Sequence, residues 1–372
     1  MSVKANVRSP YFLKYSDSTL TSVELSLYVY SGDVTTDKGD VVYTLSNDVI
    51  GSNDYVIFQV ADFVRDYIEH SFTGVYSTTP YWFTAEATLY AGDTVLRTEV
   101  VDRLAFDSYT KYEDGINSEG TRAELITTRS IRIPSGQVYR LPIFSEDVIS
   151  VTEETLLGSD LTTAAAFWNE ENREWQIDED YWDNSAQSNI SVVSTNVNSS
   201  VTKVQYFTIA STVDRVTVAT SGNTYDIISS EDDCSKYGWD KLTFINKHGV
   251  LQDFYTTGKK EENISFKDSD YKSSDINFGT MTYDASQGQT RRFDINSKRR
   301  ISLNSGFIHE NEMSSLEELI MSEHVWLTNE AGDVTKVIPT DSSLKISTHI
   351  NDKLINVKIN LEYASDNLNT VI

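Results

Sequence analysis

The chain has 372 residues, of which 39% are hydrophobic and 23% charged, a balance typical of a folded protein rather than a disordered one. This length exceeds one ordinary β-domain and predicts two or three domains, each with its own core. Lys and Arg total 31 against 56 Asp and Glu, and the resulting formal charge of -25 disfavours direct binding to nucleic acid.

Residues 1–120 show the alternation of half-buried antiparallel strands. Apolar side chains occupy every second position from 23 to 29 and again from 81 to 89. Residues 60–68 instead carry apolar side chains at helical spacing, and Gly74 lies just beyond the expected helix end. We therefore predict a β-sandwich with one packed helix.

Residues 121–228 predict a second β-domain. A polar, glycine-bearing stretch at 114–120 precedes it and is a favourable place for a domain junction. Inside it, residues 170–198 form a looser, acidic stretch, and we expect nearby tryptophans to anchor this stretch: Trp168, Trp175 and Trp182. The strands expected in this domain span 130–133, 148–152, 204–209, 216–219 and 225–228.

Residues 229–372 predict a third β-rich domain with one helix. Strands are expected at 239–246, 250–255 and 264–266, and the last strand, 355–363, has the most regular alternation in the chain. Together the three ranges predict a mainly β fold. It has two or three antiparallel β-sandwich-like domains in series, with one helix in the first domain and one in the last.

The helix of the third domain has a start signal. Its apolar stripe runs through Leu316 and Leu319, and it is expected to end near His324, whose imidazole can bond the last helix carbonyls. Two pairs have the spacing of a capping box: Ser314 with Glu317, and Ser315 with Glu318.

Motifs for catalysis or cofactor binding are missing from the sequence. It contains no Gly-x-Ser-x-Gly elbow, no phosphate-binding loop and no dinucleotide fingerprint. The five histidines are scattered without metal-ligand spacing, so we predict no metal site and no cofactor. Cys234 is the one cysteine, so an intrachain disulfide is not possible. It lies beside acidic residues, which disfavour a reactive thiolate. We predict that the protein is not an enzyme.

One acidic and aromatic segment leaves two alternatives open. Residues 178–183 hold four acids, and the neighbouring aromatic side chains are able to stack on a sugar ring. In one alternative, Trp175, Tyr181 and Trp182 form the platform of an adhesin that binds a host receptor or surface glycan. In the other, the acids serve a polysaccharide hydrolase.

A local charge reversal stands out within this acidic chain. Five cations fall inside ten residues, with Phe293 and Ile295 between them in strand-like alternation. Such a stretch suits docking against an acidic neighbour, including another copy of the chain. It also suits a solvated edge strand that resists aggregation. The cations are Arg291, Arg292, Lys298, Arg299 and Arg300.

Several segments of the third region resemble virion structural proteins of tailed bacteriophages, of the tail, baseplate or fibre-attachment type. They are 239–254 (WDKLTFINKHGVLQDF), 292–296 (RFDIN), 303–308 (LNSGFI), 323–327 (EHVWL) and 352–363 (DKLINVKINLEY). The resemblance implies a β-rich protein that multimerises inside a particle and has no active site. Its expected partners are copies of itself and other virion proteins, arranged as a ring or collar.

The sequence also bears on location. No stretch approaches the roughly 18 apolar residues of a membrane helix, and the first residues lack the apolar core of a signal peptide. We therefore expect no membrane segment, synthesis in the host cytoplasm and a final place in the virion.

Overall fold

The computed structural model describes residues 4–32, 38–51, 53–76, 81–115, 125–144, 148–154, 167–169, 174–176, 191–196, 204–210, 215–219, 223–230, 237–273, 276–283, 285–341 and 354–366. These residues form a mainly β protein with several separate sheets and two α-helices, which confirms the predicted fold class. Each sheet takes its strands from one of the three predicted ranges.

The first range folds as a sandwich. Its larger sheet has the order β1 (Lys4–Asn6), β7 (Thr94–Phe106), β6 (Tyr81–Ala91), β3 (Ser22–Ser31) and β4 (Tyr43–Asp48). A smaller sheet pairs β2 (Phe12–Ser16) with β5 (Tyr55–Gln59), and α1 (Ala61–Arg65) follows β5.

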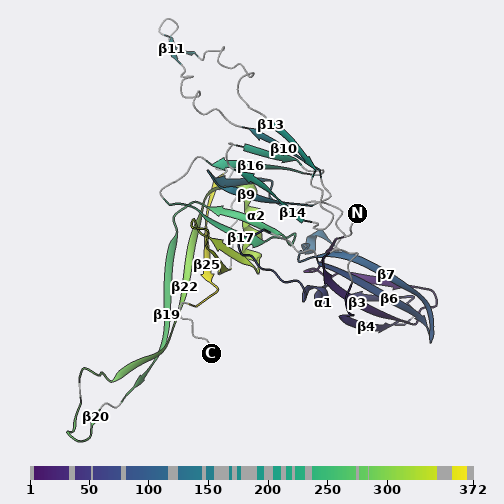
Figure 1. Ribbon diagram of the computed structural model, residues 1–372, viewed down its shortest axis with the longest axis horizontal. Coiled ribbons are helices and arrows are strands. Elements are labelled where there is room, and N and C mark those ends of the chain that lie inside the picture. Colours follow the sequence, from purple (N-terminus) through teal and green to yellow (C-terminus); the bar gives the residue numbers. More distant parts are fainter. Residues whose placement is uncertain are drawn as a thin grey trace.

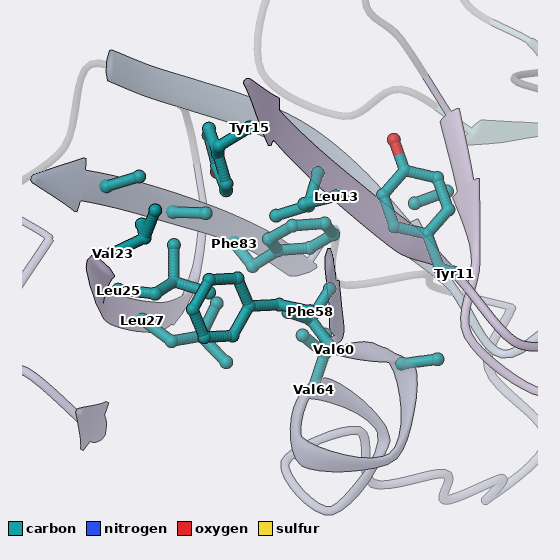
Figure 2. Close-up of a cluster of buried hydrophobic side chains, with 14 of the residues drawn as sticks. Tyr11, Leu13, Tyr15, Val23, Leu25, Leu27, Phe58, Val60, Val64 and Phe83 are labelled. Atoms are coloured by element: carbon teal, nitrogen blue, oxygen red, sulfur yellow. The ribbon is translucent and has the colours of Figure 1, made fainter. Parts of the chain in front are cut away.

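Figure 2 shows the core between these two sheets, into which Leu25, Phe58, Val64 and Phe83 all point. Val23, Leu25 and Leu27 of β3 are fully buried, as the alternation predicts, and Val29 on the same face is partly buried.

Helix α1 is shorter than its sequence pattern predicts. The expected helix reached residue 68, but the regular helix ends at Arg65. Beyond it, the amides of Tyr67 and Ile68 bond carbonyls three residues back, which is turn geometry. Val64 is in the core, Ile68 packs against that core from the turn, and Tyr67 is 41% exposed, so these side chains reach their environments without a longer helix.

The second range builds two further sheets. The larger has the order β13 (Ser191–Asn196), β10 (Val148–Glu154), β15 (Arg215–Ala219), β16 (Thr224–Ser230) and β8 (Ser130–Pro134). The smaller pairs β14 (Val204–Ala210) with β9 (Val138–Phe144). A short hairpin joins β11 (Phe167–Asn169) to β12 (Glu174–Gln176). The pairs β1–β7 and β8–β16 run parallel, whereas the other ladders are antiparallel.

The third range forms one seven-stranded sheet. Its order is β18 (Leu251–Thr256), β17 (Asp240–Ile245), β23 (Val325–Thr328), β24 (Val334–Pro339), β25 (Leu354–Tyr363), β22 (Thr290–His309) and β19 (Glu261–Lys272). Helix α2 (Met313–Met321) buries Leu316 and Leu319 in the core of this unit. The small pair β20 (Ile276–Asn277) and β21 (Thr282–Tyr283) lies between β19 and β22 in the chain.

The predicted capping box of α2 does not form. The helix begins one residue earlier than expected, after a 3-10 turn at Glu310–Glu312, and its N-cap Glu312 makes no side-chain cap bond. Ser315 instead accepts a hydrogen bond from Gln252 Nε2 at 2.8 Å, and Glu318 accepts one from Thr127 Oγ1 at 2.6 Å. The prediction was wrong because these side chains bond other parts of the chain.

The end of α2 also differs from the sequence-based expectation. His324 lies three residues beyond the helix, and its buried Nδ1 has no hydrogen-bond partner among the described residues. The ring stacks on Trp326 at 6.0 Å between centroids, instead of bonding the helix carbonyls. Aromatic packing therefore replaces the predicted role of His324.

The three ranges also share hydrophobic clusters. Trp82 and Phe106 from the first range pack with Val204 from the second and Val250 from the third. A neighbouring cluster joins Phe72 to Trp326, and it includes Leu251 and Tyr206. The sheets are therefore packed together around a common junction.

Candidate assembly surface

A long hairpin leaves the seven-stranded sheet, and we call it the arm (residues 259–300). Figure 1 shows β19 and β22 extending away from the other strands, with β20 at the far end. At the base, β22 pairs with β25 through Arg300 and the residues that follow, whereas from Thr290 to Ser297 it pairs only with β19. β22 contains 20 residues, which at about 3.3 Å each span up to about 65 Å. The arm is therefore the outer part of a hairpin whose inner end belongs to the seven-stranded sheet.

The apolar side chains of the arm are exposed. All twelve residues of β19 are exposed, and on β22 burial becomes continuous only near Ile301 and Leu303. Where only two strands pair, neither face has a covering layer. The exposed set on the shaft is Ile264, Phe266, Tyr271, Phe293 and Ile295, and on the tip it is Ile276, Phe278, Met281 and Tyr283.

The cations predicted to make assembly contacts all lie on β22 within this arm. The structure surrounds them with acids of the same chain. Arg292 pairs with Asp268 at 2.5 Å, and Arg299 pairs with Glu262 at 2.6 Å. Arg291 lies opposite Tyr271 in the β19–β22 register.

Lys298 and Arg300 share one acid on the neighbouring strand. Their distances to Glu362 are 2.7 and 2.9 Å, and hydrogen bonds from Lys298 and then Arg300 lower the pKa of that carboxyl. Because the cations are more than half exposed, these pairs are weak and able to exchange partners.

The charge of the arm differs from that of the remaining chain. Residues 259–300 hold nine Lys or Arg and seven Asp or Glu, whereas the other residues hold 22 and 49. The arm is therefore slightly positive and the remainder of the chain strongly negative.

A groove of about 340 Å³ lies at the base of the arm. It runs between β8 and the part of β22 where the pairing with β25 shifts register, between Asn304 and Phe307. Gly306 has a φ of +70° in this bulge, a conformation that suits glycine. Phe307, 63% exposed, and Tyr237, 42% exposed, line the groove together with Arg132 and Lys259.

Two clusters of ionisable side chains lie at the junction of the ranges. Asp253, 3% exposed, accepts hydrogen bonds from Tyr76 at 2.6 Å and Thr243 at 2.7 Å. Burial raises the pKa of Asp253, although Lys241 and these hydrogen bonds oppose the rise. Lys241 Nζ donates to the Tyr76 hydroxyl at 2.9 Å. The cluster ties the first range to the third.

The second cluster is centred on Asp107. Burial alone would raise its pKa, but the hydrogen bond with His70 and the charges of Arg8 and Arg65 outweigh burial and lower it. Both arginines also reach Glu323, at 3.0 and 2.7 Å. The bonds of both clusters therefore connect the first range to the third.

The other residues singled out from the sequence are placed as follows. Trp175 lies in β12, opposite Trp168 of β11 in the register, and its side chain is outside the described part. Tyr181, Trp182 and Cys234 lie outside the described residues, so the aromatic platform stays a prediction. Among the described residues there is no group of three or more His, Cys, Asp or Glu able to hold a metal ion. Within the same residues, no helix has the length and apolar character needed to cross a membrane.

Sequence reasoning missed the aromatic tip and the base groove. The tip has a readable signal, because Phe278, Met281 and Tyr283 fall in a segment without Lys or Arg between Lys272 and Arg291. The groove has none, since residues from β8 and from the β22 bulge meet only in the folded chain.

Comparisons with known proteins give no family assignment. No protein-family model matches the chain, and no curated protein matches it. One solved structure, titled the calcium-binding domain CBD12 of CALX1.1, is similar over 61% of this chain and 78% of that one, at 11% identity. Its TM-score is 0.16, too low to bear on fold or function.

Proposed function

We propose that this chain is a non-catalytic structural component of a tailed-phage particle. In this proposal it is present in several copies in the tail, collar or baseplate region and packs against itself and other virion proteins. The phage class comes from the resemblance of segments such as 239–254 and 352–363. The assembly role is supported by the arm.

The observation that carries the assembly role is the two-stranded arm with exposed apolar side chains. A hairpin of two strands is marginally stable in water without a covering layer. Clustered exposed apolar side chains are typical of surfaces that bind other proteins. Phe266 and Phe293 are 67% and 50% exposed among the described residues, and another molecule that covered the arm would bury them.

The assembly role is tested by sedimentation velocity of the full chain over a range of concentrations. We expect wild-type protein to associate, and a Phe266→Ser, Phe293→Ser, Ile295→Ser variant to remain a monomer. A matched control carries Phe12→Ser, Ile57→Ser and Val100→Ser on the first sandwich, where these side chains are also exposed. The control is expected to associate like wild type. Equal association of all three proteins would remove the arm from the proposal.

The phage class needs a separate test. Particles purified from a host that carries the gene should contain this chain, detected by mass spectrometry and seen as repeated density by electron microscopy. Particles that contain every neighbouring structural protein but not this chain would refute a virion role.

A further inference from the structure

The base groove is a built site with an open apolar rim. Arg132 donates a 2.7 Å hydrogen bond to the carbonyl of Phe307, which holds the rim beside β8. The backbone is also tightly placed, because a Cβ on Gly258 would lie 2.6 Å from Asn304. A groove of about 340 Å³ with exposed aromatic walls favours a small apolar group. Its charged lining residues are Arg132, Glu312 and Lys259, which pairs with Glu261 at 3.1 Å, so cations outnumber acids at the groove.

The arm tip matches this chemistry. Ile276, Phe278, Met281 and Tyr283 are 40%, 78%, 78% and 72% exposed. The charged residues between Lys272 and Arg291 are acids only, Asp275 and Asp284. By sequence, the tip segment therefore carries apolar side chains and two acids, whereas two of the three charged side chains that line the groove are cations.

The tip is also fixed in shape before any contact. The amide of Met281 donates to the carbonyl of Asn277 at 2.8 Å, and the amide of Gly279 donates to the side chain of Asn277 at 3.0 Å. Met281 itself has a φ of +53°, a conformation that costs about 1 kcal/mol for a residue other than glycine. A tight turn that presents apolar side chains to solvent loses little entropy on binding.

We propose that the arm tip of one copy seats in the base groove of a second copy. The second copy is required because tip and groove lie at opposite ends of the same extended arm (Figure 1). This inference rests on the proposed assembly function and adds its geometry. The contact joins two different surfaces, which is the kind of interface that builds rings when it closes.

The test is cysteine cross-linking in a Cys234→Ser background. One population carries Phe278→Cys at the tip and another carries Phe307→Cys at the groove rim, with tags of different size. After mixing and mild oxidation, we expect a disulfide-linked heterodimer between the two populations. The matched control is Phe266→Cys on the shaft, where the phenylalanine is 67% exposed against 78% for Phe278, and it should give at least tenfold less product with Phe307→Cys. Lys259→Glu on the groove copy should reduce the yield several-fold.

The outcomes separate this inference from the proposed function. Tip-to-tip products, or equal yields from the tip and shaft cysteines, would overturn the seating in the groove. If wild-type protein still associates in sedimentation, the assembly function survives that result. A chain that stays monomeric at every concentration and gives no cross-link would count against both.

Discussion

Strands β18 and β19 are the two edges of the same seven-stranded sheet, and they have opposite environments. All six residues of β18 are buried, and all twelve of β19 are exposed. β18 is covered because strands of the second range, including β9, pack against it. Tyr255 of β18 lies inside the core of the second range. β19 has no such cover among the described residues. An open edge of this length invites pairing or packing with another chain, so the protein has closed one edge itself and left the other available.

The largest expected effect comes from truncating a phenylalanine on the buried edge. Phe254→Ala should lower the free energy of unfolding by about 3–5 kcal/mol, because Phe254 is 6% exposed and packs in the core of the third range. Phe266→Ala on β19 should change it by less than about 0.5 kcal/mol. Urea denaturation measures both values. Similar losses for the two variants would show that the arm is covered within one chain.

The polar contacts of the buried edge can be tested with a single hydroxyl. Tyr76→Phe removes the hydroxyl that donates to buried Asp253 and accepts from Lys241. It should lower the free energy of unfolding by about 1.5–3 kcal/mol. Tyr271→Phe on the exposed arm is the control and should have almost no effect. Thermal and urea unfolding of both variants would decide, and a neutral Tyr76→Phe would contradict the role given to this cluster.

The turn that leads into β18 depends on a close backbone approach. Gly249 has a φ of +75°, and a Cβ there would lie 2.9 Å from backbone atoms of Asp107. Gly136 has a similar φ of +78° with nothing within 4 Å. Both alanine variants should be destabilised by about 1 kcal/mol through backbone strain, and Gly249→Ala by about 1–3 kcal/mol more through the contact. Equal losses of unfolding free energy for the two variants would mean that the backbone at the junction moves to accept the added Cβ at no cost.

The smallest effect concerns pH. Burial, with the charges of Lys4 and Lys247, lowers the pKa of His248 to about 3. Between that value and 6.5 the folded state binds fewer protons than the unfolded state, so the free energy of unfolding falls as pH falls through this window. His324, whose pKa is also lowered by burial and by His70, acts in the same direction.

His248→Gln isolates the contribution of this one side chain. The variant should lose about 2 kcal/mol less stability than wild type between pH 8 and pH 5, as measured by urea denaturation at each pH. Asp253 and Glu318 oppose the trend in both proteins, because burial raises their pKa values and protonation then favours the folded state. Parallel pH profiles would show that His248 gains a proton without cost in the folded state.

Alternation along the chain predicted the mainly β fold and strands such as β3, β6, β17, β18 and β25, whereas β7, β9 and β24 were not predicted. The faces of β3 and the final strand β25 follow directly from the period of two, as does the placement of the basic stretch on a strand. The sequence signals for the two helices predicted their bounds and caps less accurately. The pattern at 60–68 overran the helix, and the serines and glutamate expected to cap α2 bond Thr127, Thr128 and Gln252 instead.

The sequence by itself therefore determined the mainly β class, the faces of its most regular strands, how acidic the protein is and where its cations cluster. Only the tertiary structure decided which sheet edge is covered, which residues share the junction and where the base groove lies. The reason is physical: alternation records the environment of a strand's two faces, because neighbouring side chains point in opposite directions. The cover of an edge, and the shape of a groove, depend on backbone and side chains brought from distant parts of the chain.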